Sequence, residues 1–173
     1  NESGSSVKVY NGSTELGAAT VSGTSWSYSA TVADGTTYQF NVKGTDPAGN
    51  TSSATSNFAV TGDTTAPTLA ITMTNTGGQD PYDIKTADNN PTITFNFSET
   101  PSGFAAADIT VQNGSIGSTL AVNGSDDTLY TATFTPTCCG ASGVYDTTNV
   151  VLVEQNWADL AGNAPAANST SAN

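Results

Sequence analysis

The stretch Gly62-Asp63-Thr64-Thr65-Ala66-Pro67 decides how this chain of 173 residues is organised. Strand-like sequences, residues 56–60 and 68–73, run into it and out of it. Pro67 fixes its own φ angle and favours an extended conformation at the preceding residue, so the connection is short and stiff. Asp63 therefore carries a carboxylate that can act only together with the loops of the two bodies it joins.

Apolar residues alternate with polar ones along most of the chain, and turn residues separate the alternating runs. This pattern predicts an all-β protein, with one helical turn near residues 105–108 as the exception. We predict two β-sandwich domains, residues 1–62 and 68–173, joined by a linker of residues 63–67. The strand candidates are residues 7–10, 16–21, 26–29, 38–42 and 58–60 in the first domain and residues 69–73, 92–97, 109–111, 129–134 and 150–153 in the second.

The charge balance excludes several classes of function. The chain has 15 acidic residues, three lysines, no arginine and no histidine, which gives a net charge of −12. Nucleic-acid binding and adsorption to anionic membranes both need cationic side chains, so neither is expected. Catalysis by histidine and histidine-ligated zinc are impossible, and no phosphate-binding or serine-nucleophile motif occurs. We expect a protein that is not an enzyme and whose acidic surface attracts divalent cations.

Cys138 and Cys139 are adjacent in the sequence. Neighbouring cysteines rarely bond to each other because the geometry strains the peptide between them, so we predict no disulfide framework. Two thiols in a loop are expected, with a strained vicinal disulfide or a bond to another chain as the alternatives. No signal peptide and no long apolar run is present, and direct insertion into a membrane is not expected. The abrupt start suggests a piece of a longer exported protein.

An internal repeat follows the same plan in both domains. Residues 46–50 and 159–163 share the motif D-x-A-G-N, and each copy comes after an apolar strand. Together with the linker D-T-T-A-P of residues 63–67, this repeat resembles the bacterial immunoglobulin-like repeats of giant surface adhesins of the RTX and biofilm-associated kind. The resemblance is carried by Trp26 and residues 4–10, 33–36, 46–50, 63–67, 95–99, 103–104, 108–110, 134–136 and 159–163.

The resemblance implies two tandem immunoglobulin-like sandwiches in an extracellular protein of the bacterial cell surface. It also implies neighbouring repeats of the same longer chain as partners, and contact with a host-cell or abiotic surface through other domains. Residues 1–62 depart from the family pattern because the first two strands are missing. About seven strands are expected in such a sandwich, and this domain offers five.

Mapping the motifs onto a seven-strand sandwich predicts calcium sites at the domain ends. Calcium takes six to eight oxygen ligands, which carboxylates, amides and carbonyls supply. One predicted site joins the linker to loops of both domains, and a second lies at the entry end of the first domain. The ligands we predict for the first site are Asp63, Asp34, Glu99, Asp159 and Asn163, and those for the second are Glu2, Asp46 and Asn50.

Each of these residues also has an interpretation without metal. Asp and Asn bond their own backbone in tight turns, and Gly adopts positive φ, so D-x-A-G-N is a good turn by itself. Residues 34–35 fit a plain turn, Glu99 fits a solvated strand end, and residues 126–127 fit a turn as well. The acidic run of residues 80–90 is interpreted as a solvated loop, with an additional calcium site as the alternative.

Three functions are compatible with these features. The first is a calcium-rigidified spacer of a surface adhesin, which holds an adhesive tip away from the cell. The second is a ligand- or carbohydrate-binding module, which needs exposed aromatic residues, with Trp157, Tyr82 and Tyr145 as candidates. The third is a subunit of a surface filament or layer, in which the incomplete first domain accepts a strand from another chain.

Overall fold

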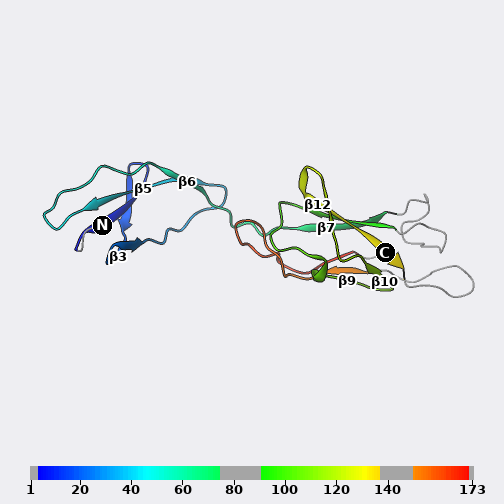
Figure 1. Cartoon of the computed structure of the whole chain (residues 1–173). Coiled ribbons are helices and arrows are strands. Elements are labelled where there is room, and N and C mark those ends of the chain that lie inside the picture. Colours follow the sequence, from blue (N-terminus) through cyan, green and yellow to red (C-terminus); the bar gives the residue numbers. More distant parts are fainter. Residues whose placement is uncertain (1–3, 75–90, 137–149, 172–173) are drawn as a thin grey trace, which may run out of the picture. The chain divides into compact units, whose positions relative to one another are not determined.

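The computed structural model describes residues 4–74, 91–136 and 150–171 (Figure 1). Contacts divide the chain into unit 1, Asn1–Thr64, and unit 2, Thr65–Asn173. Strands dominate both units, and the one helical element described is a single 3-10 turn in unit 2. None of the described helical structure is long and apolar enough to cross a membrane.

Unit 1 contains a four-stranded antiparallel sheet and a separate two-stranded hairpin. The Asn11-Gly12 turn joins the first two strands of the sheet, with Gly12 in the left-handed region at φ 59°. The expected strand at residues 16–21 is divided in two, because the chain leaves the sheet and enters the hairpin. The sheet order is β2 (Thr14–Ala18), β1 (Ser6–Asn11), β5 (Thr37–Thr45) and β6 (Phe58–Thr61), and the hairpin is β3 (Thr20–Ser22) with β4 (Ser25–Ser27).

The alternation expected for residues 38–42 places one row of apolar side chains on the same face of the unit 1 sheet. The rings of Tyr38 and Phe40 stack at 5.5 Å, and Val42 lies opposite Val9 of β1. In the described part of unit 1, however, Val7 and Val9 are the only buried apolar residues. This unit therefore encloses a very small core.

Unit 2 is a two-layer β-sandwich. The strand β8 alternates as expected, with every second residue facing the opposite sheet. The expected helical turn is the 3-10 turn η1 (Ala106–Asp108). One sheet has the order β10 (Gly114–Ile116), β12 (Asp126–Pro136), β8 (Thr92–Phe97) and β7 (Leu69–Thr74), with β11 (Ala121–Asn123) on β12, and the other has β14 (Ser169–Ser171), β13 (Val151–Val153) and β9 (Ile109–Val111).

A contiguous hydrophobic core fills the space between the sheets of unit 2. Its central residues are at most 8% exposed, and the rings of Phe97 and Trp157 meet edge to face at 4.8 Å. The prediction of an all-β, immunoglobulin-like sandwich is confirmed. The core residues are Ile93, Phe95, Phe97, Ile109, Ala132, Phe134, Val151, Val153 and Trp157.

Candidate functional site

The two D-x-A-G-N motifs form the same closed loop. In unit 1, the carboxylate of Asp46 accepts hydrogen bonds from the backbone N–H and the side-chain amide of Asn50, both at 2.8 Å. In unit 2, Asp159 accepts the same two bonds from Asn163, again both at 2.8 Å. The glycine between them adopts positive φ in each loop, 92° and 94°. The turn chemistry expected of the motif is therefore present in both copies.

Asp159 remains a carboxylate at neutral pH despite its burial. Burial acts to raise the pKa of this group, but the hydrogen bonds from Asn163 and from the backbone of the loop act in the opposite direction. The net result is a pKa below the ordinary value. Because each carboxylate oxygen has further lone pairs, Asp159 can accept a cation in addition to these bonds.

Asp159 belongs to a group of three acids that we call the carboxylate cluster: Asp63, Glu99 and Asp159. One carboxylate oxygen from each lies within 4.8 Å of the others. Asp63 is exposed, Glu99 is half-buried, and Asp159 is 2% exposed. Three of the five ligands predicted for the first site are thus brought together, although they are far apart in sequence.

Two pairs of hydrogen bonds position the loops that carry Glu99 and Asp159. The N–H of Thr68 donates to the hydroxyl of Ser98 and the N–H of Ser98 donates to the carbonyl of Thr68, both at 2.9 Å. Ser102 and Ala158 exchange two backbone hydrogen bonds of 2.6 and 3.0 Å. The start of β7, the loop after β8 and the D-x-A-G-N loop therefore meet at one end of unit 2.

The donor set of the carboxylate cluster fits a hard divalent cation. Three carboxylates supply up to six oxygens, and calcium prefers such ligands at a coordination number of six to eight. Three like charges at this spacing repel one another unless a cation is present or a proton is taken up. The chain has no histidine to offer a softer ligand, and carboxylate oxygens suit hard divalent cations such as calcium.

Asp34 is placed next to the linker within unit 1. Its carboxylate accepts the N–H of Thr64 at 2.7 Å, and residue 34 forms a parallel bridge with Gly62. Gly62 is buried, and a Cβ at this position would overlap the carbonyl oxygen of Ala33. Glycine is therefore required here by the close approach of the two backbones. Asp34 thus fixes the residues on either side of Asp63.

The other predicted ligands have different surroundings. Asn163 donates two hydrogen bonds to Asp159, and its role as a ligand stays a prediction. Asp46 and Asn50 bond each other, and Glu2 lies outside the described residues, so the entry-end site stays a prediction. The turn expected at residues 126–127 lies instead at residues 124–125, and residues 126–127 begin β12, where Asp126 accepts bonds from Thr128. Also outside the described residues lie the acidic run of residues 80–90, Tyr82, Tyr145, Cys138 and Cys139.

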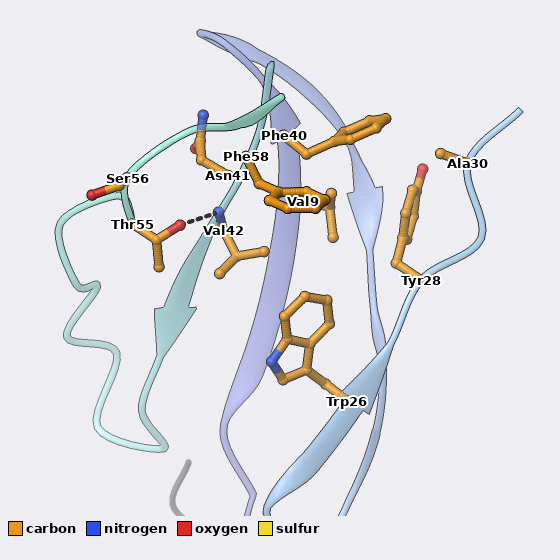
Figure 2. Close-up of a pocket in the computed structure, with 10 residues that line it drawn as sticks. All are labelled: Val9, Trp26, Tyr28, Ala30, Phe40, Asn41, Val42, Thr55, Ser56 and Phe58. Atoms are coloured by element: carbon orange, nitrogen blue, oxygen red, sulfur yellow. Dashed lines mark hydrogen bonds between the residues drawn. The ribbon is translucent and has the colours of Figure 1, made fainter. Parts of the chain in front are cut away.

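Sequence analysis did not identify an apolar groove on unit 1 (Figure 2). The groove encloses about 380 Å³ and is lined by side chains of β1, β4, β5 and β6. Two aromatic residues on it are unusually exposed, Trp26 at 45% and Phe58 at 70%. The sequence feature that could have revealed the groove is the presence of Trp26 and Phe58 in a domain for which only five strands are predicted.

Comparison with known proteins identifies a domain family for this chain. A family model described as a bacterial Ig-like domain matches residues 63–173, which begins at Asp63 and includes all three members of the carboxylate cluster. Neither the curated proteins nor the solved structures contain a significant match.

Proposed function

We propose, since the chain belongs to the family of bacterial Ig-like domains, that it is a calcium-rigidified extender module of a large bacterial cell-surface adhesin. Domains of this family are commonly part of extracellular or surface proteins and generally serve structural or adhesive roles without catalysis. In this proposal calcium stiffens the linker of residues 63–67. The adhesin that contains the chain is of the RTX and biofilm-associated kind.

The observation that supports calcium is the carboxylate cluster itself. Asp159 is held as a buried carboxylate by its own loop, Glu99 follows β8, and Asp63 lies on the linker. A cation bound to all three would join the linker to two loops of unit 2. The free energy of cation binding would then oppose rotation about the backbone of residues 64–67.

The neighbouring repeats of a longer chain would be the direct partners of such a module. Each calcium-stiffened connection would reduce the bending of the string and keep a distal adhesive tip away from the cell. Contact with a host-cell or abiotic surface would occur through other domains. Extracellular calcium modules bind with dissociation constants of about 10⁻⁴ to 10⁻³ M, which millimolar external calcium can fill.

The alternative of a carbohydrate-binding module receives no support from the described aromatic candidate. Trp157 is 4% exposed and packs against Phe97 in the core of unit 2. It therefore offers no stacking face to a sugar. The groove on unit 1 is a separate feature that does not involve Trp157, and mostly apolar side chains from several strands line it.

Calcium titration of the full chain by isothermal calorimetry tests the site. Asp63→Asn and Glu99→Gln keep the size of each side chain and remove its charge, so each should weaken calcium binding about tenfold or more. Asp126→Asn is the matched control, because Asp126 is an aspartate of unit 2 at the start of β12 and lies outside the cluster. The titration extends to a calcium concentration of about 10⁻² M, well above the expected dissociation constant. Absence of calcium binding up to that concentration, or equal affinity in all three variants and the wild type, would reject the proposal.

A further inference from the structure

One tripeptide, Asn-Gly-Ser, occurs three times in the chain, at residues 11–13, 113–115 and 123–125. An asparagine followed by glycine loses its side-chain amide readily, because glycine has no side chain to shield its backbone nitrogen and restricts the backbone least. Since the tripeptide is the same at all three places, a difference in reactivity between them comes chiefly from the fold. The structure gives the three copies different surroundings.

The first copy is held by the neighbouring strand β5. The side-chain carbonyl of Asn11 accepts the backbone N–H of Gln39 at 2.7 Å, and the N–H of Gly12 donates to the carbonyl of Gln39 at 2.8 Å. These bonds restrain both groups that would have to react, the amide of Asn11 and the backbone nitrogen of Gly12. The two groups cannot meet until both hydrogen bonds to β5 have broken.

The second copy is held by packing. Asn113 adopts positive φ, 54°, and Gly114 begins β10, where it lies opposite Pro136 of β12. A Cβ on Gly114 would overlap the ring of Phe134, which is fully buried in the core of unit 2. The backbone of Gly114 therefore lies against the core, and it cannot turn toward the side chain of Asn113 without displacing that ring.

The third copy lies at the hairpin turn between β11 and β12. Asn123 is exposed, and in the described part of the chain its side chain has no hydrogen-bond partner. The N–H of Gly124 donates to the carbonyl of Val122 at 2.8 Å, which closes a local γ-turn centred on Asn123. Gly124 has positive φ, 44°, with open space where a Cβ would lie. Only this local turn has to change for the two reacting groups to meet.

We propose that Asn123 is a site of spontaneous deamidation in the folded protein, with water as the co-reactant. The backbone nitrogen of Gly124 attacks Cγ of Asn123, so a new N–Cγ bond closes a cyclic imide and the Cγ–Nδ2 bond breaks. Ammonia leaves with the proton from the nitrogen of Gly124. Water then opens the imide: attack at Cγ gives aspartate, and attack at the main-chain carbonyl gives isoaspartate. No oxidant or reductant is needed.

The modification changes the strand pair that contains it. Asn123 lies opposite Asp126, so the aspartate product faces a second carboxylate across the two strands. Like charges directly opposite each other destabilise a strand pair. Isoaspartate adds a methylene group to the main chain and disturbs the same pairing. Because β11 pairs only with β12 among the described residues, deamidation loosens β11 and leaves the core of unit 2 intact.

The test incubates the full chain at physiological temperature and slightly alkaline pH and measures each tripeptide by mass spectrometry after digestion with pepsin in acid. Asn123 should lose its amide about tenfold or more faster than Asn11, because two hydrogen bonds to β5 must break first at Asn11. Asn113 should also react slowly. A parallel sample in guanidinium chloride is the control, and there the three identical tripeptides should react at similar rates.

Two variants complete the test. Asn123→Gln keeps an amide on a longer side chain that closes a ring less readily, so this hairpin should remain unmodified. Asn123→Asp carries one product from the start, and amide hydrogen exchange in β11 should be several-fold faster than in the wild type, with exchange in β8 unchanged. Equal rates at the three sites in the folded chain, a faster reaction at Asn11 or Asn113, or no reaction at Asn123 while the denatured chain reacts would overturn the proposal. Unchanged exchange in Asn123→Asp would overturn the inferred loosening of β11.

Discussion

The carboxylate of Asp34 accepts a hydrogen bond of 2.7 Å from the backbone N–H of Thr64, the residue that directly follows Asp63. This contact ties the beginning of the linker to the turn after Ala33. The bridge between residue 34 and Gly62 acts on the other side of Asp63. The backbone around the linker carboxylate is therefore shaped within unit 1, before any cation is considered.

Removing the Asp34 carboxylate should release Thr64. In Asp34→Ala the N–H of Thr64 loses its acceptor, and a hydrogen bond of this kind contributes about 0.5–1.5 kcal/mol. Hydrogen exchange at the Thr64 amide should accelerate roughly two- to tenfold, while exchange in β5 stays unchanged. Unchanged exchange at Thr64 would show that the bond does not form in solution.

Gly62 should not tolerate a side chain. A Cβ on this residue overlaps the carbonyl oxygen of Ala33, so Gly62→Ala must displace one of the two backbones. We expect a loss of about 1–3 kcal/mol in the stability of unit 1, as for other overpacked sites. Chemical denaturation followed by the amide signals of unit 1 measures the loss. Gly117→Ala, at an open position of unit 2, is the control and should have little effect.

Two phenylalanines should differ sharply in their contribution to stability. Phe95 is fully buried in the core of unit 2, so Phe95→Ala should destabilise that unit by about 3–5 kcal/mol. Phe58 is 70% exposed, and Phe58→Ala should change the stability of unit 1 by about 0.5 kcal/mol or less. Thermal unfolding measured for both variants checks this contrast. A large loss in Phe58→Ala would mean that the groove is already filled in the free chain.

The D-x-A-G-N loops should make stability depend on acid pH. Folding lowers the pKa of Asp46 and Asp159 below the ordinary value of 3.8, so the unfolded chain binds more protons in the acid range. Their contribution is complete above the unfolded pKa and is lost as the pH falls through the folded pKa. Urea unfolding at a series of pH values should show a decline below about pH 4, and Asp159→Asn should reduce that decline in unit 2. A flat profile in the wild type would contradict this assignment.

Much of the fold was predictable because its signals are local. Alternation at residues 92–97 specifies both the strand and its buried face, and the Asn11-Gly12 pair specifies a turn. The strand β14 carries no such signal, because its residues Ser169–Ser171 are all polar, although they pair antiparallel with β13. The division of residues 16–21 between two strands was also hidden, since it depends on where the chain crosses between layers.

The candidate site was predictable in part for a different reason. The loops after β8 and β13 share one end of a sandwich, so Glu99 and Asp159 follow from topology. Asn163 stays a predicted ligand, and the structure adds that its side-chain amide donates a hydrogen bond to Asp159. That bond depends on the closed geometry of the loop, which residue spacing does not determine.

Amide nitrogen-15 relaxation of the full chain, with calcium and with chelator, tests the central claim most directly. If a cation on Asp63, Glu99 and Asp159 stiffens the linker, the two units should tumble with one common correlation time in calcium and with two separate times after chelation. The strand signals of unit 2 should not move, and Asp63→Asn should show separate tumbling in both conditions. Identical relaxation of the wild type with and without calcium would contradict the account.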